Sequence, residues 1–122
     1  KSINFLQLDG THTGSFKLCH ELSNQAVKND INPVTHVWGT NLALLINTHM
    51  ACANNNISLI EVPSINLELN QYLYPEGIQI KDGFINLKDA PGFGVTLDND
   101  IKNKFKFVPN SGYVLPSNRK FK

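Results

Sequence analysis

The first half of the chain alternates short apolar runs with longer segments of helical spacing. The runs cover residues 3–8, 31–35 and 57–60. Between them, residues 16–28 and 42–53 carry apolar side chains three or four positions apart, which is typical of helices. The order β-α-β-α-β predicts a parallel sheet with right-handed crossovers.

The two predicted helices differ in how far they should be buried. In residues 16–28, Leu18, Cys19, Leu22 and Ala26 form one apolar face, and Ser15 is a suitable N-terminal cap. Residues 42–53 are apolar nearly all round, so we expect this helix to be buried on several sides.

Beyond Pro63 the pattern changes to short strands and turns. Residues 78–80 and 84–87 flank Lys81-Asp82-Gly83, which predicts a β-hairpin. A turn-rich loop follows at residues 89–95, then a short amphipathic piece around residues 98–107, and then an irregular tail.

A polar residue follows each of the three apolar runs: Asp9, His36 and Glu61. They stand 27 and 25 residues apart, about one strand-plus-helix unit each. Chemistry in parallel α/β sheets collects at the carboxyl ends of the strands, so we expect the three side chains to form one site.

Composition and charge exclude several classes of function. The 122 residues carry a net charge of +1, which gives no field for nucleic acid, and Arg119, Lys120 and Lys122 make only a short basic tail. No apolar run approaches 18 residues, so we expect no membrane span. Cys19 and Cys52 lack metal or redox spacing; we expect both to be buried reduced thiols, in a cytoplasmic protein.

The chain begins at Lys1 and enters a core strand almost at once. A processed or trimmed chain would explain this, but a C-terminal fragment of a larger protein explains it better.

Several motifs together resemble the mandelate racemase/muconate lactonizing enzyme group of the enolase superfamily. They are Leu8-Asp9 with Gly14, residues 34–40 (VTHVWGT), residues 59–61 (LIE), residues 80–84 (IKDGF) and residues 91–95 (PGFGV), and they occur in the family's order. Two positions depart from the family pattern: Ser15 stands where a second glycine is usual, and Leu8 where proline is common.

The resemblance implies the fold. Residues 1–63 would be strands 6–8 of a modified (β/α)8 barrel with their helices, and residues 64–122 the C-terminal hairpin and tail, which pack toward a capping domain that is missing. A whole barrel needs about 250 residues. The second-strand lysine bases and the three Mg-binding carboxylates of the family would therefore lie outside this chain, which has no metal ligands of its own.

The resemblance also implies the roles of the site residues. His36 and Asp9 would form the His-Asp dyad that abstracts a proton α to a carboxylate, in chemistry for which the family relies on Mg. The muconate lactonizing and dipeptide epimerase branch carries lysine at position 9, so Asp9 favours the mandelate racemase-like and acid-sugar dehydratase branches. Glu61 resembles the eighth-strand acid that binds the substrate carboxylate and the enediolate oxygen.

Other roles for these residues stay open. His12 follows Asp9 on the catalytic face and could touch substrate, and Trp38 could wall the pocket or belong to the core. Direct zinc binding by Asp9, His12, His36 and Glu61 is a weaker alternative, because no short ligand spacing supports it.

The predicted function is that of a lyase or isomerase. Dehydration of an acid sugar is preferred, and a racemase or epimerase is the alternative. The isolated chain would be catalytically inactive and would self-associate through exposed sheet edges; an inert structural fragment and a free-standing binding module are further hypotheses.

Overall fold

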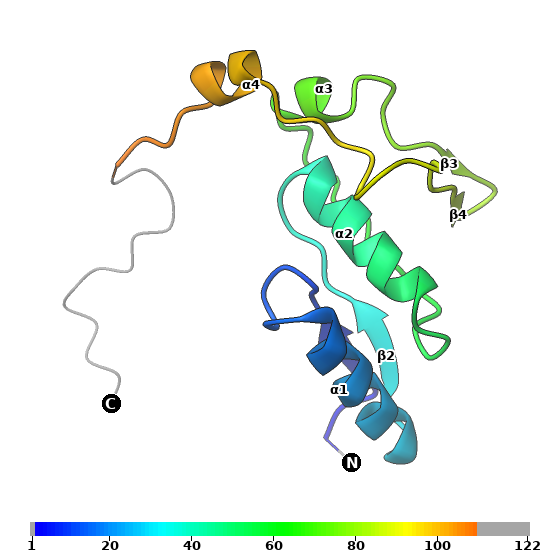
Figure 1. The fold of residues 1–122 in the computed structure, drawn as a ribbon. Coiled ribbons are helices and arrows are strands. Elements are labelled where there is room, and N and C mark those ends of the chain that lie inside the picture. Colours follow the sequence, from blue (N-terminus) through cyan, green and yellow to red (C-terminus); the bar gives the residue numbers. More distant parts are fainter. Residues whose placement is uncertain (1, 110–122) are drawn as a thin grey trace.

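The computed structural model describes residues 2–109, so the basic tail at residues 119–122 lies outside the described part. Figure 1 shows the order of the elements. They are β1 (Phe5–Leu8), α1 (Phe16–Lys28), β2 (Asn32–Thr35), α2 (Asn41–Cys52), α3 (Asn70–Leu73), β3 (Ile80–Lys81), β4 (Phe84–Ile85) and α4 (Asn99–Lys104).

β1 and β2 form the predicted parallel pair, connected through α1. Their register runs from Phe5 beside Asn32 to Leu8 beside Thr35. The backbone N–H of His36 donates to the carbonyl of Leu8 at 2.8 Å, which extends the pairing one residue beyond β2. Asp9 and His36 therefore leave neighbouring strands at the same edge.

The prediction of a regular third strand is wrong. Residues 57–60 lie beside β2, where the N–H of Thr35 donates to the carbonyl of Leu59 at 3.2 Å, but they form no assigned strand. Two features of β2 explain this. The backbone nitrogen of Pro33 faces residues 57–60, as that of Thr35 does, but proline has no N–H to donate. In addition, the N–H of Glu61 donates to the side-chain oxygen of Thr35 at 3.0 Å and not to a backbone carbonyl.

The predicted cap of α1 is confirmed, but its predicted apolar face is partly wrong. Ser15 accepts a hydrogen bond from the N–H of Leu18 at 3.1 Å. The Leu18 side chain itself is exposed, whereas Ser23 is fully buried. Ser23 can be buried because its hydroxyl has partners: it donates to the carbonyl of His20 and accepts from Asn54, at 2.9 and 2.7 Å.

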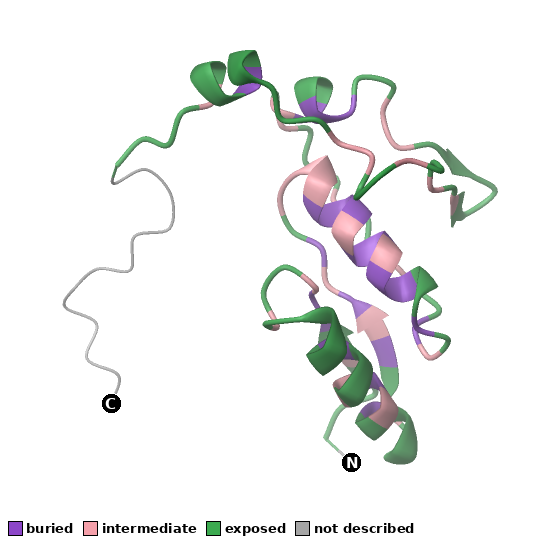
Figure 2. Ribbon diagram, viewed as in Figure 1, coloured by how far each residue is buried: buried purple, intermediate pink, exposed green. Residues whose placement is uncertain are grey.

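Two apolar clusters hold the elements together, and α2 belongs to both. The first joins Leu8 of β1 to Cys19 of α1 and Met50 of α2, and the second joins Val37 to Leu44 of α2. Figure 2 shows buried residues along much of α2, as its all-round apolar character predicted. Both helices thus pack on the same side of the β1–β2 pair.

The second half of the chain contains the predicted hairpin. β3 and β4 are antiparallel and shorter than expected, and they are joined by Asp82 and Gly83, both with positive φ (51° and 81°). Ile78 and Ile85 pack against the second apolar cluster. The hairpin is therefore anchored to α2.

Two short helices complete the described chain. The pattern did not predict α3, which lies by the start of α2 (Figure 1), where the Asn70 side chain accepts from the N–H of Asn41 at 2.7 Å. α4 realises the predicted amphipathic piece but ends at Lys104, leaving Phe107 84% exposed.

The two cysteines differ, so the expectation that both are buried is wrong for Cys52. Cys19 is fully buried, and burial raises the pKa of its thiol. Cys52 is exposed, because it is the last residue of α2, beyond the buried positions Met50 and Ala51.

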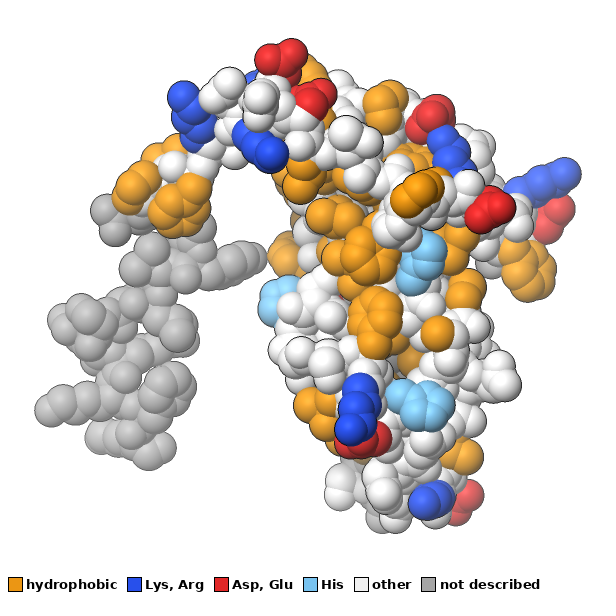
Figure 3. Space-filling model, in the orientation of Figure 1, with side chains coloured by type: hydrophobic (Ala, Val, Ile, Leu, Met, Phe, Trp, Pro, Cys, Tyr) orange, Lys and Arg blue, Asp and Glu red, His pale blue; other side chains and the backbone are white. Residues whose placement is uncertain are grey.

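Charged side chains of both signs are interspersed on the face seen in Figure 3. Within residues 2–109, no helix is long and apolar enough to cross a membrane.

Candidate active site at the carboxyl ends of the strands

Asp9 and His36 form a hydrogen-bonded pair where β1 and β2 end. The Nδ1 atom of His36 lies 3.0 Å from Oδ2 of Asp9. A carboxylate only accepts hydrogen bonds, so the His36 ring carries its hydrogen on Nδ1 and leaves Nε2 free to take a proton. The His36 side chain is 43% exposed, while that of Asp9 is 6% exposed.

The Asp9 carboxylate is held ionised in spite of its burial. Burial by itself would raise the pKa of Asp9, but hydrogen bonds from Thr11, His36 and Asn47 outweigh it, and the pKa lies far below its usual value. Thr11 donates to Oδ1 from its backbone N–H and its hydroxyl, at 2.8 and 2.6 Å. Asp9 is therefore a fixed negative charge that orients the His36 ring.

His12 contacts the same carboxylate oxygen. Its Nδ1 atom lies 3.0 Å from Oδ2 of Asp9 and 2.7 Å from the hydroxyl oxygen of Thr11. Its side chain is 72% exposed. The structure thus places His12 beside Asp9, and its predicted contact with substrate stays a prediction.

The Glu61 side chain binds a backbone N–H at the same end of the strands. Its Oε2 atom accepts from the N–H of Val37, the residue after His36, at 2.8 Å. Trp38, the expected pocket wall, is 50% exposed, which excludes a core role within the described residues. The three predicted site residues therefore lie at one edge. Asp9 and His36 are in direct contact, and Glu61 contacts the residue that follows His36.

Asn47 is a member of this arrangement that the sequence reasoning missed. It lies in the middle of α2 and is fully buried. Its side-chain amide donates to Oδ1 of Asp9 at 3.1 Å, and its oxygen accepts from the N–H of Gly10 at 2.8 Å. One signal was available: Asn47 interrupts an otherwise apolar helix, and a buried amide there requires polar partners.

Thr11 was also missed, although its spacing was informative. An Asp followed two residues later by a residue whose N–H returns to the carboxylate is a common turn. Thr11 and Asn47 both donate to Oδ1 of Asp9, Thr11 from the loop after β1 and Asn47 from α2. With His36 on Oδ2, three separate segments of the chain hold the Asp9 carboxylate.

The described residues do not fit a metal centre. Across residues 2–109, no group of three or more His, Cys, Asp or Glu side chains is arranged to hold a metal ion. His12 and His36 each place Nδ1 against the Asp9 carboxylate. Direct zinc binding by the Asp9, His12, His36 and Glu61 set is therefore not supported.

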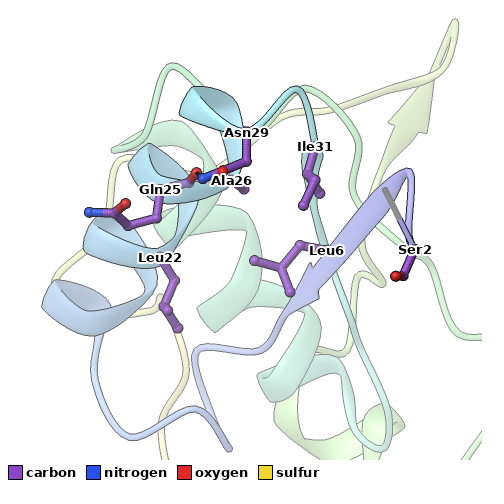
Figure 4. Close-up of a pocket in the computed structure, with 7 residues that line it drawn as sticks. All are labelled: Ser2, Leu6, Leu22, Gln25, Ala26, Asn29 and Ile31. Carbon is purple, nitrogen blue, oxygen red and sulfur yellow. Dashed lines mark hydrogen bonds between the residues drawn. The ribbon is translucent and has the colours of Figure 1, made fainter.

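A pocket of about 390 Å³ lies away from this site, between α1 and the edge of β1. Figure 4 shows Leu6, Leu22 and Ile31 around it, with Gln25 and Asn29 on the helix side. Its lining contains no titratable side chain. It offers no acid-base chemistry, so the candidate site remains at the opposite end of the strands.

Comparison with known proteins identifies the class to which this fold and this site belong. A model of the enolase C-terminal domain-like family matches residues 1–101. The chain therefore belongs to this family, and the parallel strands with their helices are the corresponding part of its (β/α)8 barrel. The fold and the superfamily expected from the motifs are confirmed.

Two curated relatives carry the name of a dehydratase or of a dehydratase family. The chain is 24% identical over 106 residues to the arabinonate dehydratase of Saccharolobus solfataricus, covering 87% of this chain and 28% of the relative. It is 27% identical over 108 residues to a D-galactonate dehydratase family member of Enterococcus gallinarum, covering 86% and 27%. The chain thus spans little more than a quarter of the length of either relative.

Solved structures agree on the fold. A mandelate racemase/muconate lactonizing enzyme from Jannaschia sp. CCS1 matches 88% of this chain and 27% of its own, with a TM-score of 0.71 and 21% identity. An enolase from Pantoea ananatis with bound d-gluconate and Mg matches 84% of this chain and 25% of its own, with a TM-score of 0.67 and 17% identity.

Proposed function

We propose that this chain is the C-terminal barrel portion of an acid-sugar dehydratase, in which His36 and Asp9 abstract the proton α to the substrate carboxylate. The observation that carries the proposal is the 3.0 Å contact between His36 Nδ1 and a buried, ionised Asp9. A relative named arabinonate dehydratase and another named a D-galactonate dehydratase family member support the substrate class.

The roles of the chain's own residues follow from their positions. Nε2 of His36 takes the α-proton, and Asp9 stabilises the imidazolium that forms. Glu61 accepts a hydrogen bond from the N–H of Val37 at the same edge, and we assign the contact with the substrate carboxylate to it. Positioned proton transfer of this kind contributes about 10²–10⁴-fold to a rate.

A magnesium ion would stabilise the negative charge that develops on the substrate carboxylate. One structural relative contains Mg with d-gluconate. Because the described residues form no metal cluster, we propose that the Mg ligands and the lysine bases come from outside this chain. The isolated chain should then be inactive.

Racemisation or epimerisation is the alternative, because it begins with the same proton abstraction. Its product would keep the hydroxyl group that a dehydratase removes. Formation of a 2-keto-3-deoxy acid therefore separates the two reactions.

The experiment assays the full-length protein with Mg on arabinonate, galactonate and d-gluconate. We expect keto-acid formation by the unaltered protein and its loss, by about 100-fold or more, in His36→Asn. His20→Asn is the matched control, because His20 is an exposed histidine on α1 away from the site. Turnover that survives His36→Asn would remove His36 from the role of the base.

A further inference from the structure

The contacts around Asp9 contain one feature that a two-residue dyad does not need: a second imidazole on the same carboxylate oxygen. Oδ2 lies 3.0 Å from Nδ1 of both His36 and His12. Oδ1 is fully used by Thr11 and Asn47. Asp9 thus sits between two histidines that come from different loops.

The hydrogen-bond network fixes which nitrogen of His12 carries a hydrogen. The Thr11 hydroxyl has one hydrogen, which it donates to Oδ1 of Asp9 at 2.6 Å. Its oxygen can therefore only accept from His12, 2.7 Å away. Nδ1 of His12 donates to both Thr11 and Asp9, and Nε2 is left for exchange with another group.

Charge balance gives the two rings different roles. Asp9 supplies one negative charge, which compensates one imidazolium, and two adjacent imidazolium rings would repel each other. The 72% exposed His12 side chain can be hydrated when charged, whereas the His36 side chain is only 43% exposed. A pair with one protonated and one neutral member is a combined acid and base.

We propose that His12 is the general acid that protonates the departing hydroxyl group, while His36 is the base. This inference rests on the proposed function. Nε2 of His36 takes the α-proton, and the C–H electron pair passes into the enediolate. A C=C bond then forms between the α and β carbons, the β C–O bond breaks with its pair on oxygen, and Nε2–H of His12 donates a proton to that oxygen, so that water leaves.

The positive charge beside Asp9 is conserved through this step. His12 begins as the imidazolium and ends neutral, and His36 does the reverse. The enol that is released takes a proton at its β carbon and loses the proton of its enol hydroxyl group, which gives the 2-keto-3-deoxy acid. No oxidant or other co-reactant is required.

The test compares two rates in the full-length protein with Mg and d-gluconate, arabinonate or galactonate: exchange of the α-proton in D₂O and formation of keto acid. Exchange needs only the base, while dehydration needs the acid as well. In His12→Asn the amide nitrogen keeps a donor near the place of Nδ1, and the group corresponding to Nε2 is removed. We expect dehydration to fall by about 100-fold or more and exchange to fall by less than about tenfold.

Other outcomes are equally informative. Dehydration that persists in His12→Asn but falls with exchange in His12→Ala would make His12 a positioning residue only, and would overturn the proposal. Equal losses of both rates in His12→Asn would overturn it too. If the unaltered protein neither exchanges nor dehydrates any of the three acids, the proposed function itself fails; activity of the unaltered protein with full dehydration in His12→Asn refutes the acid role alone.

Discussion

Replacing Asn47 with leucine should weaken the protein through the Asp9 carboxylate. Leucine has a similar size but removes the donor to Oδ1 of Asp9 and the acceptor for the N–H of Gly10. A hydrogen bond to a charged group contributes about 1.5–3 kcal/mol, and a buried donor left without a partner costs about 1–3 kcal/mol. Gly10 is only partly buried, and leucine adds apolar contact, so we expect a net loss of about 2–4 kcal/mol in the free energy of unfolding.

The pH dependence of this loss separates it from ordinary packing damage. The folded-state pKa of Asp9 lies below its unfolded value of about 3.9. Its stabilising contribution is therefore complete above about pH 4 and is lost as the pH falls below that value. Asn47→Leu raises the folded-state pKa of Asp9 part of the way toward its usual value. The unfolded pKa is the same in both proteins, so their difference in stability is constant at neutral pH and shrinks only where the pH falls through the two folded-state pKa values, at about pH 2.

The assay is denaturant unfolding of the full-length protein at several pH values. Thr48→Val is the matched control: Thr48 is the neighbouring buried residue of α2, and its hydroxyl donates only to the carbonyl of Leu44, at 2.8 Å. We expect a smaller loss there, about 1 kcal/mol, with no added dependence on acid. The reasoning is refuted if the two variants lose equal stability, or if the Asn47→Leu loss is the same at about pH 2 and at pH 7.

Two further predictions concern the rest of the chain. Asp98 caps α4 by accepting from the N–H of Ile101 at 2.8 Å, so Asp98→Ala should destabilise α4 by about 1 kcal/mol and speed hydrogen exchange of its amides, whereas the exposed Asn103→Ala should not. The isolated chain should self-associate, because Phe5 of β1 and Leu59 in the segment beside β2 are 55% and 60% exposed; elution as a monomer with a cooperative melting transition would contradict this.

The sequence predicted those parts of the fold that repeat a regular pattern. The helix beginning after Ser15, the all-round burial of α2 and the Asp82-Gly83 hairpin each follow from a local rule. The prediction of a strand at residues 57–60 failed because strand formation depends on the neighbouring strand, and Pro33 in β2 has no N–H to donate to these residues. The sequence did not predict α3 because four residues are too few to show a helical period.

The same distinction applies to the site. Parallel-sheet geometry predicted that Asp9 and His36 would meet, since each follows its strand directly. Asn47 stands 38 residues from Asp9, and its contact depends on how α2 packs, which no local pattern contains. The exposure of Leu18 and Cys52 likewise follows from which neighbours α1 and α2 have, and not from their own sequences.

The central claim is that Asp9 makes His36 a base, and exchange of the substrate α-proton in D₂O tests it most directly. Asp9→Asn keeps the size of the side chain but removes the charge that fixes the His36 tautomer and stabilises its protonated form. We predict that exchange on d-gluconate, arabinonate or galactonate, whichever the unaltered full-length protein accepts, falls by about 10²–10⁴-fold in Asp9→Asn, with the protein still folded. Exchange within about tenfold of the unaltered rate would contradict the account.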